Sequence, residues 1–318
     1  MKRFLQKTTI FLLFIFLMAY ALDYAICDGL LKMEDGRFMS WADCKKGNAA
    51  SDVVIIGNSR ALSHFEPMTI DSICHLTAFN LGTGGYAINV DLLKYRFYRE
   101  HNTAPKIIVF EVGHIVMQIW EARQHFQSEQ FFPLFHDYAM KSELVKVGYS
   151  YLDVLVPLYR IWGYQDIIKK GMYEFLGIEH YRSFPTERGL NYERGEWDGA
   201  ELAKQKVIDG SMNAKAKALF EDFMEECKSQ KIKVILVKSP MYIGRTRKTT
   251  HLKEEREYFQ SMAKKHNTVF LDYSVNYPLC NDTTKFVSSV HMNPIGAHLF
   301  SVDFADTLNT ILHRPEKK

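Results

Sequence analysis

A short run of β-branched residues that ends in a glycine constrains the fold of this chain more than any other stretch. Val53–Ile56 is continuously apolar, which is typical of a strand buried on both faces of a parallel sheet. Gly57 ends the run, Ser59 follows it, and Arg60–Phe65 can begin a helix. Ser59 is therefore expected at a strand-to-helix turn, where the carboxyl ends of parallel strands place ligands. Taken alone, Ser59 is better explained as a helix N-cap than as a functional residue.

Four further apolar runs have the length of buried strands, and amphipathic helical patterns alternate with them. These runs are Thr77–Leu81, Lys106–Val112, Ile232–Val237 and Thr268–Leu271. Strands that alternate with helices predict a parallel sheet covered by helices on both faces. We therefore expect an α/β, flavodoxin-like three-layer sandwich with a five-stranded parallel sheet.

The N-terminus carries a membrane-targeting pattern. Lys2, Arg3 and Lys7 precede the apolar stretch Ile10–Ile26, which is 17 residues long and interrupted by Asp23. This length is at the short end of what spans a bilayer as a helix. Basic residues before the stretch and acidic ones after it predict a single-pass cell-membrane protein with a cytoplasmic N-terminus and an extracytoplasmic main domain.

A cleaved signal peptide is the alternative to a retained anchor. The sequence around Ala19 and Ala21 has the small-x-small form of a cleavage site. The apolar character continues past that site, which favours the anchor. We predict an anchor over residues 1–28, a linker over 29–50, and a main domain over 51–318 that contains a largely helical insertion at 115–210.

Composition argues against several classes of function. The formal net charge of the 318 residues is only +3, and basic residues are not clustered among aromatic ones, so nucleic-acid binding has little support. The five cysteines show no C-x-x-C spacing, which predicts neither a zinc ribbon nor a redox pair. No metal and no cofactor is therefore expected. Protein partners cannot be inferred.

The ends of the second and third predicted strands add candidate site residues. Gly82 begins a glycine-rich loop whose backbone N–H groups can approach a ligand closely. Glu111 and His114 end the third strand and are expected near the same sheet edge as Ser59. A histidine in such a place is more often a structural hydrogen-bonding group than a catalytic one.

The last motif places a histidine directly before a helix. Asn293 is a favourable N-cap and Pro294 a favourable first helical residue. His291 is thereby held in a loop next to a well-anchored helix, which suits a general base. Considered by itself, His291 is equally well explained as a structural loop residue.

Together, these two ends of the chain resemble the SGNH (GDSL-like) hydrolase superfamily, especially its membrane-anchored extracytoplasmic members. Gly57-Asn58-Ser59 is similar to the first block of the family, where the serine is the nucleophile. Gly82 falls where the family places its oxyanion glycine. The sequence from His291 to Gly296 resembles the last block, D-x-x-H-L-N-x-x-G.

The chain departs from the family pattern at two places. Ser288 stands where the family has its catalytic acid, three residues before the histidine. Gly113-His114 stands where G-x-N-D is expected. A serine cannot stabilise an imidazolium as a carboxylate does, so Ser59 and His291 form either a dyad, helped by Asp272, Asp282 or a backbone carbonyl, or the remnant of a lost active site.

The resemblance implies a serine esterase or O-acyltransferase acting on ester-linked acyl groups of cell-envelope polysaccharide or another ester. His291 would be the base for Ser59, the N–H groups of Ser59 and Gly82 would bind the oxyanion, and His114 would add a donor. The alternative is a catalytically inactive binding or scaffold protein of the envelope that kept the fold.

Overall fold

The computed structural model describes residues 1–124, 127–184 and 186–313. The chain forms two compact units. Unit 1 contains residues 1–43 and 121–185, and unit 2 contains residues 44–120 and 186–318. Each unit is described by itself. The predicted boundaries at residues 28, 50, 115 and 210 stay predictions.

Unit 2 is built on a five-stranded parallel sheet in the order β3-β2-β4-β6-β7. Its strands are β2 (Val53–Ile56), β3 (Ala78–Asn80), β4 (Ile107–Glu111), β6 (Lys233–Lys238) and β7 (Val269–Asp272). In this flavodoxin-like order the direction of winding reverses between β2 and β4, which makes the ends of these strands the switch point where ligands bind. The predicted α/β fold class is confirmed.

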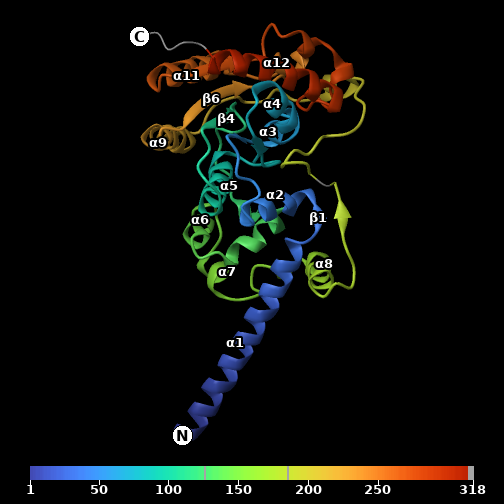
Figure 1. The fold of residues 1–318 in the computed structure, drawn as a ribbon. Coiled ribbons are helices and arrows are strands. Elements are labelled where there is room, and N and C mark those ends of the chain that lie inside the picture. Colours follow the sequence, from blue (N-terminus) through green and yellow to red (C-terminus); the bar gives the residue numbers. More distant parts are fainter. Residues whose placement is uncertain (125–126, 185, 314–318) are drawn as a thin grey trace. The chain divides into compact units, whose positions relative to one another are not determined.

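Helices cover both faces of this sheet because side chains alternate along each strand. Val53 and Ile55 belong to a core cluster with Phe300 and Phe304 of the last helix. On the other face Phe110 packs against two rings of α9, one of them Phe223, with centroids 5.6 Å apart. Figure 1 shows α12, in red, beside α4 and α3, while α9 and α5 lie on the opposite side of the sheet.

The remaining elements of unit 2 are mostly helical. They are α3 (Ser59–His64), α4 (Pro67–Cys74), α5 (Ile88–His101), α9 (Ala214–Ser229), α10 (Ile243–Thr246), α11 (Leu252–Lys265) and α12 (Pro294–Leu312), with 3₁₀ turns η3 (Ala200–Lys204), η4 (Pro278–Asn281) and η5 (Thr283–Lys285). Helix α4 was not expected from the sequence, because its eight residues are too few to show a clear helical period.

Unit 1 contains the N-terminal helix α1 (Lys2–Leu30), which is long and apolar enough to cross a membrane. It also contains η1 (Ala122–Gln124), η2 (Ser128–His136), α6 (Met140–Lys146), α7 (Tyr151–Leu155), α8 (Gln165–Phe175) and the paired strands β1 (Glu34–Asp35) and β5 (Arg182–Ser183); α2 (Gly36–Lys45) begins in this unit. Helix α1 packs closely on α8. A Cβ added at Gly29 would lie only 1.8 Å from the Gly171 carbonyl oxygen, so a glycine at this position is what permits the close approach.

Candidate active site

The structure brings Ser59 and His291 together although 232 residues separate them. His291 Nε2 lies 2.8 Å from Ser59 Oγ. Ser59 begins α3 directly after the turn that ends β2, and the N-cap of that helix is Asn58, whose side chain accepts from the Arg60 N–H. Ser59 is therefore not the cap, and its hydroxyl is free to face the imidazole. Both side chains are partly exposed, so a substrate can reach them.

Ser288 occupies the other side of the His291 ring. Its Oγ lies 3.3 Å from His291 Nδ1 and also accepts the backbone N–H of His291 at 3.1 Å. If Nε2 accepts the Ser59 proton, Nδ1 carries the hydrogen and donates to Ser288; this tautomer is assigned from the hydrogen bonds. The three side chains thus form a Ser–His–Ser relay in which a hydroxyl stands where a triad has its acid.

The loop that carries His291 is fixed at its base by the motif that follows. The Asn293 side chain caps α12 by accepting the Gly296 N–H at 2.9 Å. The Asn293 N–H donates to the Lys285 carbonyl at 3.0 Å. A Cβ on Gly296 would lie 2.2 Å from that carbonyl, so only glycine permits the approach. The predicted capping role of Asn293 is confirmed.

A second histidine supports this loop, and the sequence analysis did not identify it. His64 is fully buried at the end of α3, and its Nε2 accepts the Met292 N–H at 3.0 Å. Burial first, and then the neighbouring His291 and Arg60, hold the pKa of His64 well below its usual value, so it is a neutral acceptor. His64 ties the residue after His291 to the same short helix that carries Ser59.

Beneath the site, a buried ion pair joins the first turn of α3 to the end of β4. Arg60 Nη2 lies 2.9 Å from Glu111 Oε1, and their side chains are 1% and 0% exposed. Glu111 also accepts from Ser239 at 3.0 Å. Burial raises the pKa of Glu111, against the opposing effects of Arg60 and Ser239. Burial, and then the charge of Arg60, lowers the pKa of His291 to about 4.

Gly82 lies in a tightly held loop beside α3. A Cβ on Gly82 would lie 2.2 Å from the Leu62 nitrogen, so the loop and helix backbones are in direct contact. The Gly82 N–H donates to Asn80 Oδ1 at 2.8 Å, and its carbonyl accepts from the Lys94 ammonium at 3.1 Å. The predicted oxyanion donor is therefore already engaged within the protein.

The hydrogen bonds of the other three candidates go elsewhere. The His114 ring faces Glu255, with Nδ1 3.2 Å from Oε2. Asp272 accepts from Arg256 at 2.8 Å and from Ser274, and Asp282 caps η5. Within residues 1–124, 127–184 and 186–313, no hydrogen bond joins these three side chains to Ser59 or His291. Ser288 is the one candidate for the acid position that the structure brings to the ring.

The chain segment that returns to the sheet also touches the histidine loop. Gln205 Oε1 accepts from the Ser289 hydroxyl at 2.9 Å and lies 3.2 Å from Arg245 Nη1. Trp197 belongs to the core cluster of the α12 face. The later part of the segment predicted as an insertion thus supports the loop, a contact that the sequence analysis did not predict.

No family model matches this chain, and no curated protein matches it. A solved structure from Desulfitobacterium hafniense DCB-2, described as a lipolytic protein of the G-D-S-L family, shares 13% identity at a TM-score of 0.39. The match covers 80% of this chain and 98% of that one.

We predict that Glu111→Gln destabilises the protein, because it leaves the Arg60 guanidinium buried without a counter-charge. Breaking a buried ion pair costs about 3–5 kcal/mol, which denaturant titration would measure as a lower free energy of unfolding. The matched control is Lys106→Met, which removes the Lys106–Asp52 pair, where the lysine is 73% exposed. That change should cost less than about 1 kcal/mol. Equal losses in the two variants would contradict the role of the Arg60–Glu111 pair.

Proposed function

We propose that this chain is a serine esterase or O-acyltransferase in which Ser59 is the nucleophile and His291 the general base. The 2.8 Å contact between Ser59 Oγ and His291 Nε2 carries this proposal, because a nucleophile within hydrogen-bond reach of a base is the geometry that acyl transfer requires. As Oγ bonds to the ester carbonyl carbon, its proton passes to Nε2. His291 then returns the proton to the departing alkoxide, which leaves an acyl-Ser59 for water or an acceptor hydroxyl to attack.

The oxyanion formed in this step needs hydrogen-bond donors. Ser59 supplies its own N–H, since the first N–H groups of a helix lack intrahelical partners and Ser59 is the first residue of α3. The Gly82 N–H can add a second donor only if it leaves Asn80 Oδ1. His114, held by Glu255, is the weakest of the predicted donors.

Ser288 would orient the ring without neutralising it. A hydroxyl that accepts from Nδ1 selects the tautomer with a free Nε2, which is one of the two tasks of a triad acid. The other task, stabilising the imidazolium, requires a negative charge that Ser288 lacks. Because the positive charge of Arg60 also opposes protonation of His291, we expect slow turnover.

The substrate class and location that we propose follow from the N-terminal helix and the family resemblance. Helix α1 would anchor the protein as a single-pass membrane protein, and its basic flank would keep the N-terminus in the cytoplasm. The main domain would then act outside the cytoplasm on acyl groups of envelope polysaccharide or another ester. We propose membership of the membrane-anchored SGNH proteins on the same grounds.

A catalytically inactive envelope protein is the second candidate. Two observations favour it: a serine occupies the acid position, and the Gly82 N–H is hydrogen-bonded to Asn80. In that case the Ser59–His291 pair would be a remnant, and the loops at this edge of the sheet would bind a ligand without transforming it.

Labelling with a fluorophosphonate separates the two functions, because this reagent modifies only a serine that a base has activated. We expect the purified full chain to be labelled at Ser59, as mass spectrometry of the modified peptide would show. Ser59→Ala should abolish labelling and His291→Gln should reduce it at least about 100-fold. The control is Ser63→Ala, a hydroxyl on the same helix that donates to a backbone carbonyl. An unlabelled but folded protein would favour the binding module.

The pH dependence of kcat/KM for a simple activated ester tests the base. Only neutral imidazole can accept the Ser59 proton, and the pKa of His291 lies at about 4. Activity should therefore persist at acidic pH and fall as the pH drops through about 4, below the ordinary histidine pKa of about 6.5. A fall of kcat/KM centred near pH 6.5, as for an ordinary histidine, would contradict the lowered pKa of His291. This fall at acidic pH is called the acidic limb of the profile.

In the same experiment Ser288→Asp should move the acidic limb to higher pH, because a carboxylate at Nδ1 favours the imidazolium. It should also raise kcat/KM at neutral pH by about 10-fold or more, a fraction of the ~10⁴-fold that a triad acid contributes. The fold should tolerate the change, since Asp can accept the same Val290 and His291 N–H groups. An unshifted limb would show that Ser288 is not the orienting group.

The proposed topology predicts that a reporter fused to the C-terminus is active only outside the cytoplasm and that the chain stays in the membrane fraction after alkaline extraction. Release of a soluble, shortened chain would instead indicate cleavage near Ala21. Mutating Lys2, Arg3 and Lys7 to Glu should lower the fraction of chains whose N-terminus is cytoplasmic, because the basic residues before the helix determine its orientation. A reporter active in the cytoplasm of the wild type would contradict the topology.

A further inference from the structure

Unit 1 exposes an unusual concentration of apolar side chains in one short segment. Residues 151–162, which we call the 151–162 segment, contain α7 and the turn that follows it. Six of its side chains are exposed hydrophobics, led by Trp162 at 87% and Tyr151 at 71%: Tyr151, Leu152, Leu155, Val156, Tyr159 and Trp162. Single exposed apolar residues are normal, but a contiguous group marks a contact surface.

The two charged residues of this segment turn inward. Asp153 is 3% exposed; it caps α7 together with Ser150 and pairs with Arg123 at 3.1 Å. Arg160 is 2% exposed and donates to both oxygens of Asp23 on α1, at 2.6 and 2.7 Å. The apolar side chains of the segment thus point outward and its charged side chains point inward. This arrangement is the reverse of that on a water-facing surface, and it is the one that lipid requires.

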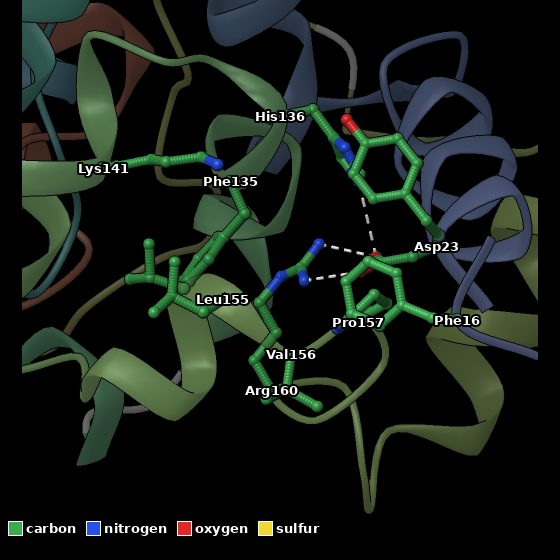
Figure 2. Close-up of a pocket in the computed structure, with 11 residues that line it drawn as sticks. Phe16, Asp23, Phe135, His136, Lys141, Leu155, Val156, Pro157 and Arg160 are labelled. Atoms are coloured by element: carbon green, nitrogen blue, oxygen red, sulfur yellow. Dashed lines mark hydrogen bonds and ion pairs between the residues drawn. The ribbon is translucent and has the colours of Figure 1, made fainter. Parts of the chain in front are cut away.

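The 151–162 segment lies against the exposed part of α1. A cavity of about 230 Å³ is lined by Phe16 and Tyr20 of α1 on one side and by Leu155, Val156 and Pro157 on the other. Figure 2 shows Phe16, Leu155, Val156 and Pro157 around the Asp23–Arg160 ion pair, and a dashed line joins His136 to Asp23 as well. The segment therefore reaches below Asp23 along the helix, to the level of Phe16.

Asp23 marks the point where α1 enters unit 1. The helix is exposed from Met1 to Leu22 apart from Ala19, and it is mostly buried from Asp23 to Leu30. The exposed apolar part from Ile10 to Leu22 is about 20 Å long at 1.5 Å per residue. The exposed residues from Phe4 to Thr9, which include Lys7, extend it to about 28 Å, close to the ~30 Å of a hydrocarbon core. Phe16 then lies about 10 Å beyond Asp23 along the helix axis, within the hydrocarbon.

Two backbone N–H groups of the segment near this level have partners within the protein. The Leu158 N–H donates to Asp23 Oδ2 at 3.1 Å, and the Val156 N–H to the Leu152 carbonyl at 3.0 Å. Asp23, Cys27 and His136 could offer ligand atoms to a metal, but Arg160 donates to both Asp23 and Cys27, and its charge opposes a second cation. The polar end of the cavity is thus closed by an internal ion pair.

We propose that the 151–162 segment inserts into the leaflet that faces unit 1, so that a lipid bilayer covers its apolar side chains. Leu155 and Val156 would lie among acyl chains, with lipid filling the cavity beside Phe16. Tyr151, Tyr159 and Trp162 would lie at the headgroup level, where aromatic residues gather in membrane proteins. The proposal depends on α1 crossing the membrane, and it adds a second membrane contact that α1 alone does not provide.

Site-directed fluorescence on the full chain tests this surface. The five native cysteines are buried, so single cysteines introduced at exposed positions can be labelled selectively with a polarity-sensitive dye. The variants are Leu155→Cys in the segment, Leu13→Cys in α1 as the lipid-exposed reference, and Val207→Cys in unit 2, a 66% exposed apolar position, as the aqueous control. Each is reconstituted into phosphatidylcholine vesicles with and without a nitroxide-labelled phosphatidylcholine.

We expect blue-shifted emission, and loss of emission with the nitroxide lipid, at positions 13 and 155 but not at 207. A lipid signal at 13 with an aqueous signal at 155 would overturn the insertion of the segment and leave the membrane span intact. Aqueous signals at both would overturn the span as well. If Leu155→Cys does not fold, the fluorescence of Trp162 itself can be used. It is obtained by subtracting the emission of the Trp162→Phe variant from that of the wild type. Brominated phosphatidylcholine should quench this Trp162 emission, and an unquenched Trp162 emission would overturn the proposal.

Discussion

A desolvated ion pair at the switch point of the sheet organises the candidate site. Arg60 comes from the first turn of α3 and Glu111 from the end of β4, and neither is exposed to water, so each requires the other. Their pairing fixes the start of α3, and with it the direction of the adjacent Ser59. Burial, and then the charge of the same guanidinium, lowers the pKa of the neighbouring His291 to about 4. The Arg60–Glu111 pair thus supports the geometry of the nucleophile, and its guanidinium adds to the effect of burial on the protonation state of the histidine.

The second determinant of the site is the way in which a distant loop is attached to α3. His64 and Ser59 are at opposite ends of one short helix; the first accepts the Met292 N–H and the second faces His291. Asn293 and Gly296 then connect the loop to α12. Because the loop is held on both sides of the imidazole, the Ser59–His291 contact does not depend on the flexible arrangement of a free loop.

The sequence predicted the sheet well because its strands are short runs of β-branched residues, a signal carried by the strands themselves. It also placed Ser59 and His291, since a strand-glycine-serine turn and an Asn-Pro helix start are local patterns. The Arg60–Glu111 pair and the acceptor role of His64 depend on contacts between distant segments, which a local pattern cannot show. Nor could the sequence show that the Gly82 N–H is bonded to Asn80, because the loop geometry decides which acceptor is in reach.

The uninterrupted course of α1 has a mechanical consequence. The helix runs without a break from its exposed half into the part buried in unit 1, where Gly29 contacts Gly171 and Asp23 is clamped by Arg160. The exposed half of the helix is therefore connected rigidly to the rest of unit 1, and not through a flexible linker. The rest of unit 1 cannot roll about the helix axis without breaking a buried ion pair. In the membrane arrangement that we propose, the tilt of the helix would therefore also determine which surface of unit 1 faces the lipid.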